Sequence, residues 1–179
     1  MQQDILKKIN QPLILMGYMG SGKTSIGKKI SEILNVNFFD LDELIEKKYN
    51  KSVKNIFNDF GEIHFRKKER EVLEKIISKK KFFVLSLGGG TPCYFDNIDL
   101  IFEKTDLTFF LKPNIKQLSK KLFEKKSKRP LVKDVKTEKK MIEFVSKHML
   151  ERINYYNMAK FHVTYDLNDK MDACKKIIG

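Results

Sequence analysis

The chain is poor in cysteine and arginine and has no long apolar run, and these shortages exclude several classes of protein. Its 179 residues include two cysteines, Cys93 and Cys174, whose spacing fits no zinc motif and which we expect to be free thiols. Every apolar run is shorter than the roughly 18 residues of a membrane-spanning helix. The first residues, MQQDILKKINQ, lack the apolar core of a secretory signal. We therefore expect a single-domain cytoplasmic protein with no membrane contact.

Arginine is scarce although the chain is strongly basic. Only four of the 36 basic residues are arginines, and the formal net charge is +13. The lysines are scattered over every predicted helix, which is typical of a solvated surface, whereas a nucleic-acid-binding surface gathers its basic residues on one element. We expect small-molecule partners, no nucleic acid and a monomer. In such a chain an arginine indicates a site that needs the planar guanidinium, which grips carboxylates and phosphates through two bonds.

Strand-like and helix-like segments alternate along the chain. We predict strands at 12–16, 36–39, 82–87, 107–111 and 161–165. Helical patterns cover 23–34, 41–49, 52–60, 62–79, 96–104, 114–124, 137–156 and 169–178. Nearly continuous apolar strands separated by helices indicate an α/β fold, with a five-stranded parallel sheet covered on both faces. Ligands of such sheets bind at the carboxyl ends of the strands.

The octapeptide GYMGSGKT, residues 17–24, joins the first predicted strand to the first predicted helix. Its spacing matches G-x-x-x-x-G-K-[ST], the phosphate-binding loop. Backbone N–H groups and the helix N-terminus of such a loop cradle anions, while the lysine reaches the terminal phosphates and the threonine can ligate Mg²⁺. An ordinary glycine-rich turn would need neither of those two residues. The predicted ATP-binding residues are Gly20, Ser21, Gly22, Lys23, Thr24 and Ser25.

Two further clusters follow predicted strands. Asp40 and Asp42 come directly after the second strand, where one carboxylate can face a metal and the other a second ligand. The alternative is that an aspartate here only caps the next helix. Gly88, Gly89 and Gly90 follow the third strand and form either a wall against which a ligand packs on bare backbone or an ordinary turn.

Three of the four arginines lie in settings that suit an anionic ligand. Arg66 stands near Glu69 in FGEIHFRKKE, where the alternative is a surface ion pair of little energetic value. Arg129 lies in the basic stretch 124–140, which is either a surface loop or a lid that excludes water from a bound nucleotide. Arg152 precedes two tyrosines in ERINYY.

In order along the chain, the phosphate-binding loop, DLDELIE, FGEIHFRKKE, LGGGTP, KRPL and ER with its tyrosines resemble the motifs of shikimate kinases. The resemblance covers residues 12–160. It implies the nucleoside-monophosphate-kinase-like P-loop fold, with a substrate-binding helical segment at about 41–70 and a mobile lid at about 114–135. It also implies transfer of the γ-phosphate of ATP, with Mg²⁺, to the 3-hydroxyl of shikimate, a step in chorismate and aromatic amino-acid biosynthesis.

The resemblance assigns catalytic and metal-binding roles. Asp42 matches the residue that hydrogen-bonds the reacting hydroxyl, and Asp40 matches the residue that helps to hold Mg²⁺ through water, together with Thr24. Arg129 matches a lid arginine that reaches the transferred phosphate and therefore also contacts ATP. The predicted catalytic residues are thus Lys23, Asp42 and Arg129.

The resemblance also assigns the substrate site. Arg66 and Arg152 match the pair that binds the shikimate carboxylate, and Gly88, Gly89 and Gly90 match the backbone wall of that pocket, which Asp42 completes. Phosphoryl transfer depends on positioning and charge stabilisation more than on covalent chemistry, so a metal, a lysine and a lid arginine suffice.

Two positions depart from the family pattern. Family members commonly stack an arginine on adenine, and here that region contains Lys120 and Lys121. The family tyrosine after Arg152 has two candidates, because Tyr156 keeps the interval from Arg152 while Tyr155 keeps the interval to the later alanine.

Two other functions stay open on the sequence. A different small-molecule kinase of the same fold, for example one acting on a sugar acid, would also need an arginine-lined carboxylate site. A nucleotide-dependent module that binds RNA or DNA would use the net positive charge, but it predicts clustered arginines and aromatic residues, which this sequence lacks.

Overall fold

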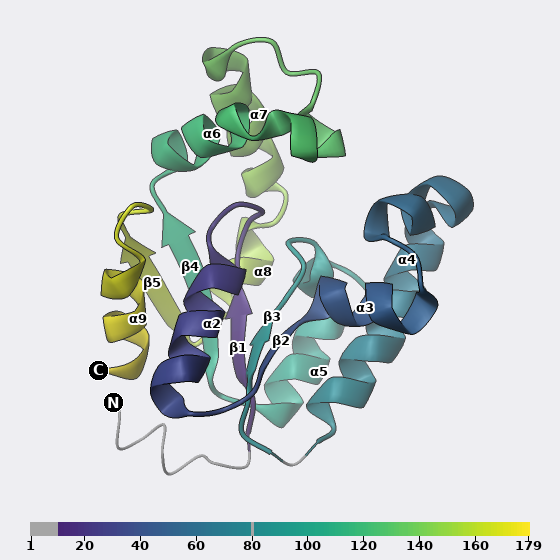
Figure 1. Ribbon diagram of the computed structural model, residues 1–179, viewed down its shortest axis with the longest axis vertical. Helices are drawn as coiled ribbons and strands as arrows, with labels where there is room; N and C mark the ends of the chain where they lie inside the picture. Colours follow the sequence, from purple (N-terminus) through teal and green to yellow (C-terminus); the bar gives the residue numbers. More distant parts are fainter. Residues whose placement is uncertain (1–10, 80) are drawn as a thin grey trace.

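Five parallel strands in the order β2-β3-β1-β4-β5 form the sheet in the computed structural model (Figure 1). The structure describes residues 11–79 and 81–179, without the side chains at 128 and 130. The strands are β1 (Leu13–Met16), β2 (Phe38–Asp40), β3 (Val84–Ser86), β4 (Thr108–Pro113) and β5 (Phe161–Tyr165). The predicted five-stranded parallel sheet is confirmed. The expectation about the N-terminal signal lies, for residues 1–10, outside the described range.

Helices cover both faces of this sheet. They are α2 (Lys23–Leu34), α3 (Leu41–Tyr49), α4 (Val53–Ile77), α5 (Asn97–Lys104), α6 (Ile115–Glu124), α7 (Glu138–Leu150), α8 (Ile153–Asn157) and α9 (Lys170–Ile178), with 3₁₀ turns at Thr91–Cys93, Lys126–Lys128 and Pro130–Val132. In Figure 1, α2 and α9 lie side by side on one face, and α5 lies on the other beside α4. Helices α6 and α7 stand together above the carboxyl end of β4.

The core runs through the middle of the sheet. Every residue of β1 is fully buried, as expected for a central strand with a helical layer on each side. None of the helices in the described part of the chain has the length and apolar character needed to cross a bilayer. Both cysteines are free thiols, as predicted.

One helical prediction is confirmed and one needs correction. The patterns at 52–60 and 62–79 form the two arms of α4, which are separated by a kink at the non-helical Gly61 (φ 79°, ψ 173°). That left-handed φ is readily accessible to glycine alone, which is why the chain can turn there and continue. The single helix predicted over 137–156 is interrupted between α7 and α8, at Glu151 and Arg152. The interruption places Arg152 as the cap of α8 rather than inside a longer helix.

Candidate active site

The phosphate-binding loop leaves the N-terminus of α2 free to receive an anion. Side chains cap the first turns of neighbouring helices, for example Asn114 on α6 and Thr137 on α7. The N-cap residue of α2 is instead Gly22 (φ 89°), which offers no side-chain cap, and the first turn of the helix contains no acidic residue. The unpaired N–H groups and the positive end of the helix dipole therefore remain available for phosphate oxygens.

A cavity of about 370 Å³, here called the phosphate cavity, opens at this loop. It is lined by Met19, Gly20, Gly22, Lys23, Thr24, Ser25, Asp40, Asp42, Ser86, Leu87, Gly88, Gly89, Lys121, Lys125, Arg129 and Lys170. The structure thus brings together the predicted ATP-binding, metal-binding and catalytic residues with one exception. Ser21 does not line the cavity, because its side chain is fully buried and its Oγ has no hydrogen-bond partner among the described residues.

Lys23 is buried and lies folded against its own loop. Its Nζ donates to the carbonyl oxygens of Gly17 at 2.7 Å and Tyr18 at 3.1 Å. Burial lowers the pKa of Lys23 to about 8, although the carboxylates of Asp42 and Asp40 oppose that shift. The ammonium group is therefore largely charged at neutral pH.

The two aspartates have different environments. Asp40, the last residue of β2, caps α3 by accepting from the Asp42 backbone N–H at 3.1 Å. Its other carboxylate oxygen accepts from the Thr24 hydroxyl at 2.8 Å. The capping alternative raised from the sequence is thus correct for Asp40, and Asp40 also joins the residue of the loop predicted to bind metal. Asp42 lies in the first turn of α3 instead of directly on the strand end.

Burial, together with the negative charges of Asp40 and Glu69, raises the pKa of Asp42 to about 6. An added Cβ at Gly88 would stand 3.0 Å from Asp42 Oδ1, so the carboxylate lies against bare backbone. Asp42 therefore lies in the phosphate cavity and has a pKa close to physiological pH. Both properties suit a proton acceptor.

Arg66 and Arg152 line a second cavity of about 510 Å³, here called the arginine cavity. Its lining residues are Phe57, Glu62, Arg66, Cys93, Tyr94, Leu131, His148, Glu151, Arg152 and Tyr155. The pair comes from α4 and from the start of α8, far apart in the sequence. The prediction that these two arginines share one site is consistent with this placement.

Arg66 is held rigidly. Its guanidinium donates from Nη1 to Glu69 Oε2 at 2.8 Å and from Nη2 to Glu62 Oε1 at 3.2 Å, and it stacks 4.3 Å from the centre of the Tyr94 ring. Burial works against its charge, but the Glu69 carboxylate more than offsets this and raises the pKa of Arg66. The predicted Arg66–Glu69 ion pair exists, but it is buried and not on the surface.

The glycine turn after β3 separates the two cavities. Gly88 and Gly89 line the phosphate cavity, while an added Cβ at Gly90 would come within 2.4 Å of Arg66 Nη2. Any side chain at Gly90 would therefore displace the guanidinium. The Gly89 carbonyl accepts a 2.5 Å hydrogen bond from Tyr156, a fully buried residue. Tyr156, and not the exposed Tyr155, supports this wall.

The segment after α6 contacts both cavities. Arg129 lines the phosphate cavity and Leu131 lines the arginine cavity. The next residue, the buried Val132, anchors the segment to the hydrophobic core. Burial lowers the pKa of Arg129, while the Tyr18 side chain works against that shift.

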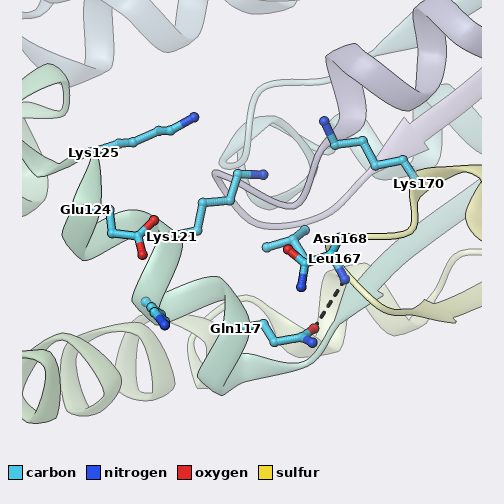
Figure 2. Close-up of a pocket in the computed structure, with 8 residues that line it drawn as sticks. Gln117, Lys121, Glu124, Lys125, Leu167, Asn168 and Lys170 are labelled. Atoms are coloured by element: carbon cyan, nitrogen blue, oxygen red, sulfur yellow. Dashed lines mark hydrogen bonds between the residues drawn. The ribbon is translucent and has the colours of Figure 1, made fainter.

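A third cavity of about 480 Å³ adjoins the phosphate cavity and shares Lys121, Lys125 and Lys170 with it. Gln117, Lys120, Glu124, Leu167 and Asn168 complete its lining. Figure 2 shows Lys121 and Lys170 extending toward the phosphate-binding loop from opposite sides. Lys121 Nζ donates to the Gly20 carbonyl at 3.0 Å, and Lys170 Nζ to the Ser25 hydroxyl at 3.2 Å.

Several lining residues were missed on the sequence. Lys170 follows β5 as the first residue of α9, and no signal in the sequence distinguishes it from the other lysines. His148 could have been found, because it stands four residues before Arg152, a spacing that brings side chains together on helical backbone.

Comparison with known proteins gives one family. The shikimate kinase family model matches residues 19–179. The shikimate kinase of Flavobacterium psychrophilum is 43% identical over 166 residues, 92% of this chain and 95% of the relative. That of Flavobacterium johnsoniae is 41% identical over 157 residues, 87% of this chain and 90% of the relative.

Solved structures agree. The crystal structure of shikimate kinase from Bacteroides thetaiotaomicron matches with a TM-score of 0.83 and 32% identity, over 93% of this chain and 94% of that one. The shikimate kinase from Acinetobacter baumannii in complex with shikimate matches with a TM-score of 0.82 and 25% identity, over 99% and 95%. The predicted P-loop kinase fold is thereby confirmed. The chain therefore belongs to the shikimate kinase family, whose members are ATP-dependent kinases that transfer phosphate to a hydroxyl group of shikimate.

Proposed function

We propose that the two cavities divide the reactants of the family reaction between them. The phosphates of ATP occupy the phosphate cavity, and the shikimate carboxylate occupies the arginine cavity. The observation that carries this assignment is the glycine turn Gly88–Gly90, which contacts Asp42 on one side and Arg66 on the other. A substrate held by its carboxylate beyond this wall presents a hydroxyl to Asp42 beside the phosphates.

Asp42 accepts the proton of the 3-hydroxyl as that oxygen attacks the γ-phosphorus and the bond to the ADP oxygen breaks. Its pKa of about 6 supports this role, because a base is most effective when its pKa lies near the working pH. Lys23 and Arg129 stabilise the charge that spreads over the transferred group, and both line the cavity in which that charge develops.

Arg66 and Arg152 hold the shikimate carboxylate through paired, charge-assisted hydrogen bonds. Arg66 is preorganised for this by Glu69 and Tyr94. The segments 41–70 and 114–135 act as the substrate-binding segment and the lid. The latter carries Arg129 and Leu131 to the two cavities and excludes water from the phosphoryl group.

Thr24 and Asp40 are the residues that would hold Mg²⁺. Their hydroxyl and carboxylate oxygens, which lie 2.8 Å apart, are the hard donors that Mg²⁺ prefers, and this ion keeps several waters and phosphate oxygens as ligands, so that one or two protein donors suffice. No group of three His, Cys, Asp or Glu side chains in the described residues could hold a metal alone, consistent with such a shared site. When bound, the ion neutralises phosphate charge.

The third cavity receives the base of the nucleotide. Leu167 offers it an apolar surface, and Gln117 and Asn168 offer polar groups. Lys120 and Lys121 lie where other family members commonly have the stacking arginine, and both line this cavity. Lys121 also bridges the base and phosphate regions through the Gly20 carbonyl. The protein acts as a cytoplasmic monomer on these small molecules and not on nucleic acid, since its lysines are spread along the whole chain.

A coupled assay of ADP release tests the proposal. The purified protein with MgATP is given shikimate and, separately, hydroxy acids that differ from it in the carboxylate or the 3-hydroxyl. We expect turnover with shikimate and loss of turnover when either group is absent. Equal rates with a sugar acid would show a different acceptor, and ADP release that is independent of any acceptor would contradict the division of the cavities.

A further inference from the structure

His148 lies between the phosphate-binding loop and the carboxylate-binding arginine. Its Nδ1 is 2.8 Å from the Tyr18 hydroxyl oxygen, and its Nε2 is 2.9 Å from Arg152 Nη2. Tyr18 belongs to the loop, His148 to the last turns of α7 and Arg152 to the start of α8. Tyr18 is fully buried, and His148 and Arg152 line the arginine cavity.

These contacts determine which nitrogen of His148 carries the proton. A guanidinium can only donate hydrogen bonds, so the Nε2 atom facing Arg152 must be the acceptor. The single proton of a neutral imidazole then stands on Nδ1 and is donated to the Tyr18 oxygen. A hydroxyl oxygen accepts such a bond readily, so both nitrogens are satisfied at once.

The surroundings keep the imidazole neutral and oriented. Burial and the positive charge of Arg152 lower the pKa of His148, whereas the carboxylates of Glu151 and Glu62 work against that shift. The Tyr18 ring meets the imidazole edge-on, with centroids 5.6 Å apart, and the Phe144 ring packs 5.4 Å away. The ring therefore has little freedom to turn away from Arg152.

We propose that His148 is a positioning residue for substrate binding: it accepts a hydrogen bond from Arg152, and Tyr18 of the phosphate-binding loop maintains the tautomer that allows it. This inference rests on the proposed role of Arg152. Arg66 is oriented by two carboxylates, which also neutralise part of its charge. Arg152 is oriented by a neutral acceptor, so its full charge is retained for the carboxylate of the substrate.

Three substitutions of His148 separate hydrogen bonding from packing. His148→Leu removes both bonds, His148→Gln places an amide oxygen near the Nε2 position, and His148→Asn reaches only the Nδ1 position. Shikimate and MgATP are titrated separately against each folded variant. We expect His148→Leu and His148→Asn to weaken shikimate binding by about tenfold, the size of one bond to a charged group. His148→Gln should restore most of the affinity, and MgATP binding should stay unchanged throughout.

Tyr18→Phe tests the other end of the network. It should weaken shikimate binding by a smaller factor, about twofold to fivefold, because the tautomer is no longer enforced but Arg152 keeps its acceptor. His162→Leu, at an exposed histidine on β5, serves as the matched control and should match wild type.

Nitrogen-15 NMR gives a readout that is independent of the substrate. The chain has three histidines, so His148→Gln identifies the signal of His148. At neutral pH we expect an unprotonated Nε2 and a protonated Nδ1 in wild type, and a mixture of tautomers in Tyr18→Phe. A protonated Nε2 in wild type would overturn the proposal, and so would equal losses for His148→Leu and His148→Gln.

Arg152→Lys, titrated in parallel, distinguishes the two levels of inference. If Arg152→Lys binds shikimate as wild type does, the proposed function is wrong at this residue and the role of His148 is wrong with it. If Arg152→Lys binds weakly while His148→Leu binds normally, Arg152 keeps its proposed role and only the positioning role of His148 is overturned.

Discussion

Arg66 and Glu69 form a buried ion pair with 2.8 Å between Arg66 Nη1 and Glu69 Oε2, and the two side chains are 8% and 0% exposed. The second oxygen of Glu69 accepts from the Thr91 hydroxyl at 2.7 Å. Breaking such a pair leaves an uncompensated buried charge, so Arg66 is expected to be locked in one geometry.

Arg66→Lys and Arg152→Lys should each weaken shikimate binding by about tenfold to a hundredfold. Lysine keeps the charge but loses the second bond and the planar geometry of the guanidinium, and a bond to a charged group contributes roughly 1.5–3 kcal/mol. MgATP binding should hardly change. Separate titrations of the two ligands measure this.

The matched control is Arg70→Lys, one turn further along α4, where the arginine bonds to Glu74 and to the Phe95 carbonyl. It should bind both ligands normally. Equal weakening of shikimate and MgATP by Arg66→Lys would indicate general structural damage and count against a carboxylate clamp.

Lys23→Ala should reduce turnover by at least about 10²–10³-fold, since it removes one preorganised contact to the phosphates. Lys28→Ala, on the exposed face of the same helix, is the control and should leave turnover unchanged. Circular dichroism checks that both variants are folded. Near-normal turnover of a folded Lys23→Ala variant would contradict the phosphate-binding assignment.

Asp40→Asn and Asp42→Asn should respond differently to Mg²⁺. Asp40 faces Thr24, so Asp40→Asn should raise the Mg²⁺ concentration that gives the half-maximal rate. Asp42→Asn should lower turnover by about 10²–10⁴-fold, as expected for loss of a general base, with ATP affinity nearly unchanged. Rates measured against Mg²⁺ for both variants check this, and identical Mg²⁺ profiles would contradict the division of roles.

Asp42→Asn should also stabilise the fold at neutral pH. The folded-state pKa of about 6 lies above the ordinary aspartate value of 3.8, so between these values the folded state binds more protons than the unfolded state. Wild-type stability therefore falls as pH rises through this window. Asn does not titrate, so Asp42→Asn does not lose this stability. Its free energy of unfolding at pH 7.5 should exceed that of wild type by about 1–3 kcal/mol.

Urea unfolding at pH 7.5 and at pH 3.5 measures the effect of Asp42→Asn. The difference from wild type should vanish at the lower pH, where the carboxyl is protonated in both states. Asp134→Asn, at an exposed carboxylate, should give no difference at either pH. If Asp42→Asn were less stable than wild type at pH 7.5, burial of the Asp42 carboxylate would not be destabilising the folded state.

Arg129→Ala should lower the turnover number by about 10²-fold, more than it raises KM for shikimate. The guanidinium matters most when charge is spread over the phosphoryl group in transfer. Steady-state kinetics with Lys133→Ala, an exposed residue of the same segment, provide the comparison. A higher KM with unchanged turnover would make Arg129 a ground-state binding residue.

Local patterns were sufficient to predict the strands, most helices and the phosphate-binding loop, because each depends on near neighbours in the chain. The break before Arg152 was missed because no glycine or proline marks it, and the adjacent helices α7 and α8 share one continuous pattern. Spacing left open which of Tyr155 and Tyr156 fills the family position. The structure adds a contact that spacing does not reveal, since Tyr156 donates to the Gly89 carbonyl, 67 positions away.

The same limit applies to the candidate site. The sequence predicts the candidate residues that lie within motifs, but it does not predict the surroundings that set the pKa and orientation of their side chains. Burial and the negative charges of Asp40 and Glu69 raise the pKa of Asp42, and Arg152 Nη2 lies 2.9 Å from His148 Nε2. Both depend on packing and side-chain contacts, which motif spacing does not predict.

The short segment 129–132 contacts both cavities. Arg129 and Leu131 line different cavities although they are two residues apart, and the buried Val132 joins them to the core as one unit. A displacement that frees the phosphate cavity must therefore also withdraw Leu131, a residue 65% exposed, from the arginine cavity. Under the proposed placement of ATP and shikimate, release of ADP and release of the phosphorylated acid would both require movement of this one segment, so that a change in its stiffness would alter both exits together.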